Sequence, residues 1–273
     1  MKNIKNINKD ELNEMINNNY WDVICKYYEL TEDFIDKYLD KVDWKLISIF
    51  QKLSEKMINK YVDKLDWEYV SMYQTLSENL IDKYHDKVDW KSISNKQILS
   101  ENLIEKYHNK VDWKFISINQ TLSEQFINKY SDKVNWEYIS GCQILSENLI
   151  EKYHDKVNWE KISMHQTLSE DFINKFQNDI NWYNIGVYQK LSENFIEKFE
   201  NKLDWDLISK YQTLSESFIE KYINNINWNN ISEGQKLSES FMEKYSDKLN
   251  WYSIYAYQTL SEAFSLKYSY KIN

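Results

Sequence analysis

Lysine recurs every 23 residues along this chain, from Lys37 and Lys60 to Lys267, and such a regular row of cations could bind a polyanion. The alternative is that each lysine pairs with a carboxylate of its own or the next repeat, such as Glu78 or Asp82. This second interpretation is favoured, because acidic residues outnumber lysines by 43 to 34 and arginine is absent. The net charge of −9 also makes nucleic acid and anionic membranes unlikely as general partners.

Three of the four histidines, His85, His108 and His154, occupy equivalent positions, which raises the question of a shared metal site. Adjacent repeats in a helical stack lie roughly 10 Å apart, too far for shared coordination at bond lengths of about 2 Å. We therefore expect solvated surface histidines, with no metal and no other cofactor. Because HExxH, CxxC, Gly-rich phosphate-loop and Ser/His/Asp patterns are absent, the sequence predicts a protein that is not an enzyme.

Cys25 and Cys142 stand about five repeats apart at different positions within their repeats, so no disulfide is expected between them. A reducing compartment is the simpler inference. Residues 1–20 lack the continuous apolar core of a signal peptide, and no stretch approaches the roughly 18 apolar residues of a membrane span. The sequence thus predicts a soluble, intracellular protein that is neither secreted nor bound to a membrane.

Two further polar positions repeat with the same period. Glutamine follows tryptophan by seven residues from Gln51 to Gln258, with Tyr28 in its place in the first repeat. We expect these glutamines to bond the last carbonyls of a short helix or to bond between repeats, rather than to contact a ligand. The serine four residues after most tryptophans, such as Ser48, is expected to allow close helix packing and not to act as a nucleophile.

The position six residues after tryptophan, called here the variable row, changes from repeat to repeat. Its members are Tyr27, Phe50, Tyr73, Lys96, Asn119, Cys142, His165, Tyr188, Tyr211, Gly234 and Tyr257. Constant positions specify stacking, whereas a variable row with six aromatic residues suits a protein-binding surface. Drift on an unconstrained face is the alternative. All members except Cys142 and Gly234 are candidate partner-binding residues.

A second alternation occurs eight residues after tryptophan. Threonine there, as at Thr75 and Thr121, alternates with lysine or isoleucine, as at Lys52 and Ile98. The genetic unit could therefore be a pair of repeats, 46 residues long, or the alternation could have no structural consequence.

The elements that position these residues follow from the tryptophans, all eleven of which are spaced 23 residues apart from Trp21 to Trp251. A unit of that size cannot bury its own apolar face and must stack on its neighbours. The predicted fold is all-α, an α-solenoid of stacked helix-turn-helix repeats. A leucine-rich repeat has a similar length but is disfavoured, because no segment shows its alternating Leu-x-Leu strand.

The stretch from Leu76 to Gln97 represents one repeat. Ser77 is suited to cap a first helix, and Glu78 places a negative charge at its positive end. Asp89 is suited to cap a second helix of about eight residues that ends near Gln97. The expected apolar stripe of the first helix consists of Leu80, Ile81, Tyr84 and Val88.

The ends of the chain fit the same scheme. Residues 8–18 keep a loose helical pattern within an N-terminal cap spanning 1–20, followed by eleven repeats over 21–273. We expect one solenoid domain over 1–273.

The repeat string LSE-x-F/L-I-x-K-Y-x-x-K-V-D/N-W-x-x-I-S-x-x-Q, running from Leu30 to Asn273, resembles the short tryptophan-containing repeat proteins of giant DNA viruses of amoebae, the mimivirus-like viruses. The abundance of Asn, Lys, Ile and Tyr agrees with an AT-rich genome. The resemblance implies a viral or virus-related protein in the host cytoplasm or the virion, with interaction as its default role. It implies no catalytic residues.

Three hypotheses about function remain open from the sequence. The leading one is a scaffold that binds another protein through the variable row. The second is a structural protein that assembles with itself or with a virion layer, which concentration-dependent oligomers would reveal. The third is a polyanion binder that uses the lysine row, with an affinity that falls steeply with salt.

Overall fold

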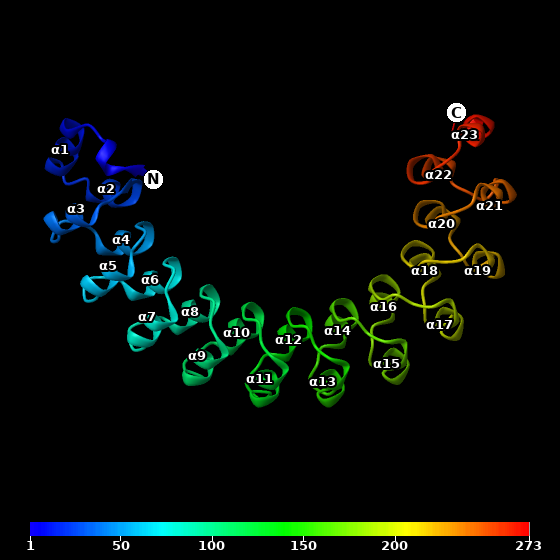
Figure 1. The fold of residues 1–273 in the computed structure, drawn as a ribbon, viewed down its shortest axis with the longest axis horizontal. Helices are drawn as coiled ribbons and strands as arrows, with labels where there is room; N and C mark the ends of the chain where they lie inside the picture. Colours follow the sequence, from blue (N-terminus) through cyan, green and yellow to red (C-terminus); the bar gives the residue numbers. More distant parts are fainter. Residues whose placement is uncertain (273) are drawn as a thin grey trace. The chain divides into compact units, whose positions relative to one another are not determined.

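The computed structural model describes residues 1–272 and is almost entirely helical, with pairs of short helices repeated every 23 residues (Figure 1). This confirms the predicted all-α solenoid of helical repeats. The chain forms two compact units, residues 1–135 and 136–273, and each is described by itself. The expectation of one domain over 1–273 stays a prediction.

Each repeat consists of a helix that begins at tryptophan, called here a Trp helix, and a helix that begins at glutamate, called a Glu helix. In unit 1 the Trp helices are α2 (Trp21–Tyr27), α4 (Trp44–Phe50), α6 (Trp67–Tyr73), α8 (Trp90–Lys96) and α10 (Trp113–Asn119). Its Glu helices are α3 (Glu32–Lys37), α5 (Glu55–Lys60), α7 (Glu78–Lys83), α9 (Glu101–Lys106) and α11 (Glu124–Lys129).

Unit 2 continues the same alternation. Its Trp helices are α12 (Trp136–Cys142), α14 (Trp159–His165), α16 (Trp182–Tyr188), α18 (Trp205–Tyr211), α20 (Trp228–Gly234) and α22 (Trp251–Tyr257). Its Glu helices are α13 (Glu147–Lys152), α15 (Glu170–Lys175), α17 (Glu193–Lys198), α19 (Glu216–Lys221), α21 (Glu239–Lys244) and α23 (Glu262–Tyr268). The 3-10 helix η2 (Ser269–Lys271) follows α23.

The N-terminal cap of unit 1 contains the predicted helix, α1 (Lys9–Asn17), together with the 3-10 helix η1 (Ile4–Asn6). Asn19, with φ 56°, ends α1 in a left-handed turn that directs the Tyr20 N–H to the Met15 carbonyl at 2.9 Å. Two short strands were not predicted: β1 (Lys2–Asn3) pairs in parallel with β2 (Tyr28–Glu29). Strand β2 contains Tyr28, which stands where the other repeats have glutamine.

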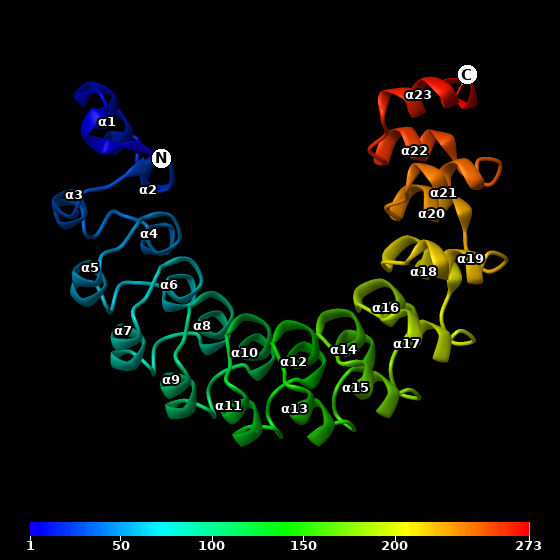
Figure 2. The same cartoon turned by 45° about the vertical axis from the view of Figure 1, so that its right-hand side comes forward.

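Within each unit the Trp helices form one row and the Glu helices form a second row beside it (Figures 1 and 2). Successive Trp helices contact one another, as α4 contacts α6 and α14 contacts α16. The centre of each repeat is apolar, because fully buried isoleucines such as Ile47 and Ile58 come from both kinds of helix. Stacking therefore buries what one repeat would leave exposed.

The helix starts follow the predicted caps. The Leu80 N–H donates to Ser77 Oγ at 3.3 Å, and the Ser92 N–H donates to Asp89 Oδ2 at 2.8 Å. The first helix is shorter than expected: α7 ends at Lys83, so Tyr84 and Val88 lie in the following turn.

The tryptophan side chain bonds the turn that follows the Glu helix. Trp90 Nε1 donates to the carbonyl of His85, two residues beyond the end of α7, at 2.9 Å. The ring of Trp90 in turn packs on Tyr107, with centroids 4.6 Å apart. The tryptophan thus joins a Trp helix to the turn before it and to the Glu helix after it.

Buried glutamines connect successive repeats. Gln74 Nε2 donates to the carbonyls of Ser48 and Gln51 at 2.9 and 2.7 Å, and its Oε1 accepts from the Leu53 N–H at 3.0 Å. Both predicted roles are confirmed, since one side chain bonds the end of a Trp helix and does so between repeats. Each such glutamine satisfies three backbone groups that the turn would otherwise leave unpaired.

The serine four residues after tryptophan has a role that the sequence did not reveal. Ser48 Oγ donates to the Trp44 carbonyl at 2.7 Å and accepts from the Asp66 N–H, at 3.0 Å, where the next Trp helix begins. The same pair of bonds recurs at Ser71 and Ser209, among others. The expected close packing is present, and the hydroxyl also bonds the next repeat.

Candidate interaction surface

The variable row lies at the last residue of each Trp helix. Five of its tyrosines keep half or more of their surface in solvent, with exposed fractions of 50% to 65%: Tyr27, Tyr73, Tyr188, Tyr211 and Tyr257. Lys96, Asn119 and His165 are also exposed, and Phe50 is half-buried. The structure therefore places the predicted partner-binding residues at the surface of units 1 and 2. That placement agrees with a binding surface and with drift alike.

Helical periodicity explains why this face is free. The constant isoleucine, serine and glutamine, three, four and seven residues after tryptophan, are buried between repeats, as Ile93, Ser94 and Gln97 are. The positions one, two, five and six residues after tryptophan fall on the other side of the helix. Variation there leaves the buried isoleucine, serine and glutamine contacts unchanged, although some of these side chains also bond the preceding repeat, as Asn119 Nδ2 bonds Asn95 Oδ1 at 3.1 Å.

In unit 1 this face combines aromatic rings with lysines. Lys26 Nζ lies over the rings of Tyr27 and Phe50, at 5.3 and 5.7 Å from their centroids. Lys45 Nζ lies 4.8 Å from the ring centroid of Tyr69, which stacks on Tyr73 with centroids 6.2 Å apart. Hydrogen bonding to Tyr69 raises the pKa of Lys45. The Lys45 ammonium therefore remains charged, and both ammonium groups are held against aromatic faces.

Between Phe50 and Tyr73 lies an open recess of about 370 Å³, also lined by Lys52 and Thr75. An equivalent recess of about 290 Å³ in unit 2 lies beside Gly234 and Tyr257. Both recesses are also lined by residues eight positions after tryptophan. The sequence did not predict that this position belongs to the candidate surface. The alternation at that position could have drawn attention to it.

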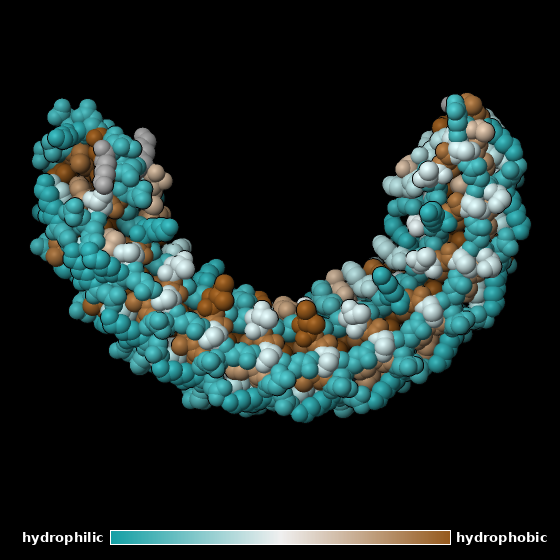
Figure 3. Space-filling view, viewed as in Figure 1, coloured by the Kyte–Doolittle hydropathy of each residue, from teal (hydrophilic) through white to brown (hydrophobic). Residues whose placement is uncertain are grey.

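The alternating position carries the most exposed apolar side chains of the repeats. Ile98 in unit 1 is 93% exposed and Ile144 in unit 2 is 95% exposed. In the space-filling view, brown and white patches show over the Trp helices, whereas the edge formed by the Glu helices is mostly teal (Figure 3). Most of the exposed large hydrophobic side chains of the repeats lie on the Trp helices or in the turns that follow them, whereas the Glu helices expose Leu266 of α23.

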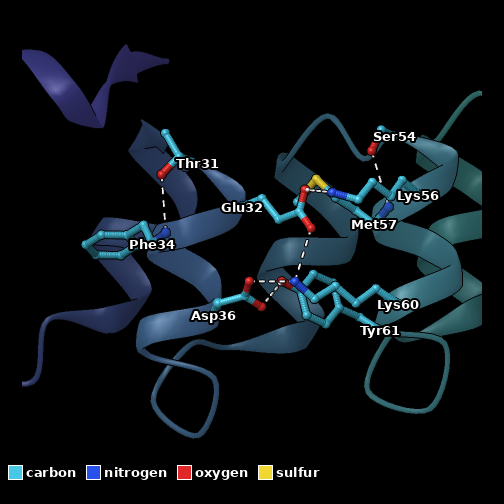
Figure 4. Close-up of polar contacts among 9 residues, drawn as sticks. All are labelled: Thr31, Glu32, Phe34, Asp36, Ser54, Lys56, Met57, Lys60 and Tyr61. Atoms are coloured by element: carbon cyan, nitrogen blue, oxygen red, sulfur yellow. Dashed lines mark hydrogen bonds and ion pairs between the residues drawn. The ribbon is translucent and has the colours of Figure 1, made fainter.

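The lysine row lies on the Glu helices, and most of its lysines form ion pairs with acidic side chains of the preceding repeat. Lys60 Nζ contacts Asp36 at 2.5 Å and Glu32 at 3.1 Å (Figure 4), and Lys106 contacts Asp82 at 2.5 Å. Hydrogen bonds from the Lys60 ammonium and, to a smaller extent, from the Tyr61 hydroxyl lower the pKa of Asp36. Pairing with carboxylates is confirmed, but the acid belongs to the preceding repeat and not to the lysine's own or the next repeat. A polyanion would have to displace these ion pairs.

Glu78, which the sequence suggested as a partner for lysine, bonds a serine instead. Glu78 accepts from both the backbone N–H and the hydroxyl of Ser100, the cap of the next Glu helix. Glu147 makes the same two contacts with Ser169 in unit 2, at 2.5 and 3.1 Å. The predicted pairing of Glu78 with lysine is wrong, because both of its carboxylate oxygens accept from Ser100.

The remaining chemical candidates form no site among the described residues. His85 and His154 are exposed and His108 is partly so, and no group of three His, Cys, Asp or Glu side chains could hold a metal ion. Burial raises the pKa of Cys25 to about 11, and this thiol accepts the Asp43 N–H in place of the usual serine. Cys142 is exposed. In the described part of the chain, no helix has the length and apolar character to cross a bilayer.

Comparisons with protein-family models, with curated proteins and with solved structures give no significant match. Any functional conclusion therefore depends on the surface itself.

Proposed function

We propose that the protein is a non-enzymatic repeat scaffold that binds another protein through the exposed face of its Trp helices. The observation that carries this proposal is that the two sides of each Trp helix have different roles. Constant residues make the bonds between repeats, while the variable row exposes five tyrosines on the opposite side. Tyrosine is enriched in protein interfaces, where it adds contact area and a hydroxyl at low entropic cost.

A pull-down with the intact chain and a variant tests the proposal. In the variant, five tyrosines of the variable row are changed to serine: Tyr27, Tyr73, Tyr188, Tyr211 and Tyr257. Amoeba lysate is the source of partners, because the resemblance to viral repeat proteins suggests that host. We expect a protein that the intact chain retains and the variant loses, with unchanged helical circular dichroism.

The matched control alters the other row. Exposed asparagines of the Glu helices, Asn79, Asn102 and Asn148, are changed to serine in a second variant, which should retain the partner. If the tyrosine variant retains the same proteins as the intact chain, the variable row reflects drift. Sedimentation at increasing protein concentration would then test self-assembly, the second hypothesis.

A further inference from the structure

Five lysines on the exposed side of unit 1 form what we call the basic face: Lys26, Lys45, Lys52, Lys91 and Lys96. All five are exposed, and none makes an ion pair among residues 1–272. The lysines of the Glu helices differ, since Lys60, Lys106 and Lys129 each contact a carboxylate at 2.5 Å. With Lys114, lysines outnumber acids on this face by six to three, since its acids are Asp22, Glu29 and Glu68. Such an excess of cations is unexpected in a chain with a net charge of −9.

The corresponding face of unit 2 is electrically balanced. Its lysines, Lys161, Lys190, Lys210 and Lys236, are matched by Glu137, Glu160, Asp206 and Glu233 at the same helix and turn positions. One pair is in contact, with Lys210 Nζ 3.4 Å from Glu233. The basic face is therefore a property of unit 1 and not of the repeat.

We propose that the basic face binds an acidic segment of a partner protein that also carries apolar side chains. This inference rests on the proposed function and specifies the partner for unit 1. The recess of about 370 Å³ between Phe50 and Tyr73 would take an apolar side chain, and Lys52 on its rim would meet a neighbouring carboxylate. Lys26 and Lys45, held over aromatic rings, would meet further carboxylates.

Lysines among aromatic rings could also bind single-stranded nucleic acid, but three observations favour a polypeptide. Stacking of bases needs free ring faces, whereas Lys26 lies over the rings of both Tyr27 and Phe50, and Tyr69 stacks on Tyr73. Ile98, 93% exposed, offers an apolar contact rather than a phosphate contact. The acidic Glu helices beside the face would repel a polymer that is charged at every residue.

The test selects ligands from a random peptide library displayed on phage, with the full chain immobilised. Peptides of about 16 residues suffice, because an extended chain of that length spans roughly 50 Å and the Trp helices of a stack lie about 10 Å apart. We expect enriched peptides that contain both carboxylates and apolar residues. Their affinity should fall as salt increases, because the contacts are exposed ion pairs.

Two variants with the same change in net charge locate the binding. In the first, four lysines of the basic face are replaced by glutamine: Lys26→Gln, Lys45→Gln, Lys52→Gln and Lys96→Gln. In the control, four lysines of unit 2 are replaced: Lys161→Gln, Lys190→Gln, Lys210→Gln and Lys236→Gln. The enriched peptide should bind the first variant at least about tenfold more weakly, and the control within about twofold of the intact chain.

Each contrary result overturns the inference. The proposal of an acidic partner is ruled out by any of three results: enriched peptides without carboxylates, equal losses of affinity in both lysine variants, or no enriched peptide. Binding of an oligothymidylate of similar length, lost in the first variant alone, would assign the face to nucleic acid instead. The proposed function fails separately: enriched peptides that lack carboxylates but require the five tyrosines would leave it standing, whereas peptides indifferent to both sets would contradict both.

Discussion

Replacing Gly186 by serine should stabilise unit 2. This buried glycine of α16 stands where most repeats have the serine that bonds the next repeat. Without that hydroxyl, the Asp204 N–H has no partner among residues 1–272, and Asp204 is exposed where Asn181 and Asn227 are half-buried. A Cβ at Gly186 would lie 3.8 Å from its nearest neighbour, Leu207 Cβ, an ordinary contact. The site therefore has room for the Cβ of a serine.

The magnitude follows from two contributions. Serine favours an interior helix position over glycine by about 0.5 kcal/mol, and one restored hydrogen bond contributes about 1 kcal/mol. We expect Gly186→Ser to raise the free energy of unfolding in urea by about 1–2 kcal/mol. The Asp204 amide should also exchange hydrogen about fivefold more slowly, as one bond of about 1 kcal/mol implies.

The reverse substitution is the matched control. Ser163 donates to the Trp159 carbonyl at 2.6 Å and accepts from the Asn181 N–H at 2.9 Å, so Ser163→Gly should destabilise by a similar amount. If Gly186→Ser lowers stability, or raises it without slowing exchange at Asp204, the serine bond between repeats does not stabilise the stack as argued.

Three further predictions concern single residues. Gln166→Ala should cost at least about 3 kcal/mol of unfolding free energy in urea, because three buried backbone groups lose their partner, and a loss below about 1 kcal/mol would contradict this. At pH 8, iodoacetamide should label Cys142 and spare Cys25, whose pKa is about 11, and mass spectrometry showing early labelling of Cys25 would refute its burial. Gly234→Ala should destabilise by about 1–3 kcal/mol in thermal unfolding, because the new Cβ would lie 2.6 Å from the Lys210 carbonyl oxygen; unchanged stability would show that this contact relaxes.

The sequence predicted the fold because its signals are local and repeated. Ser77 and Asp89 cap helices within three residues of themselves, and the tryptophan spacing fixes the repeat length. The serine bond between repeats, to a partner 18 residues away, was missed because a small residue inside a helix indicates close packing as readily as hydrogen bonding. Strands β1 and β2 were missed for a related reason: each has two residues, too few for an alternating pattern.

The candidate surface was predictable only in part. Periodicity placed Tyr73 and Lys96 on the exposed side of a Trp helix, and the structure confirms this. Composition could not separate Lys96 from Lys106, because both are lysines on short amphipathic helices. Only the coordinates show that Lys106 contacts Asp82 while Lys96 has no ion pair in the described chain.

That difference bears on whether the exposed face has drifted. Drift on an unconstrained surface should reproduce the composition of the whole chain, in which acids outnumber lysines by 43 to 34. The exposed side of the unit 1 Trp helices and their turns reverses this ratio, with the five lysines of the basic face and Lys114 against Asp22, Glu29 and Glu68. Stacking cannot explain the reversal, because the bonds between repeats use glutamine, serine and tryptophan from the buried side. A selective pressure from outside the fold, such as an acidic partner, can explain it.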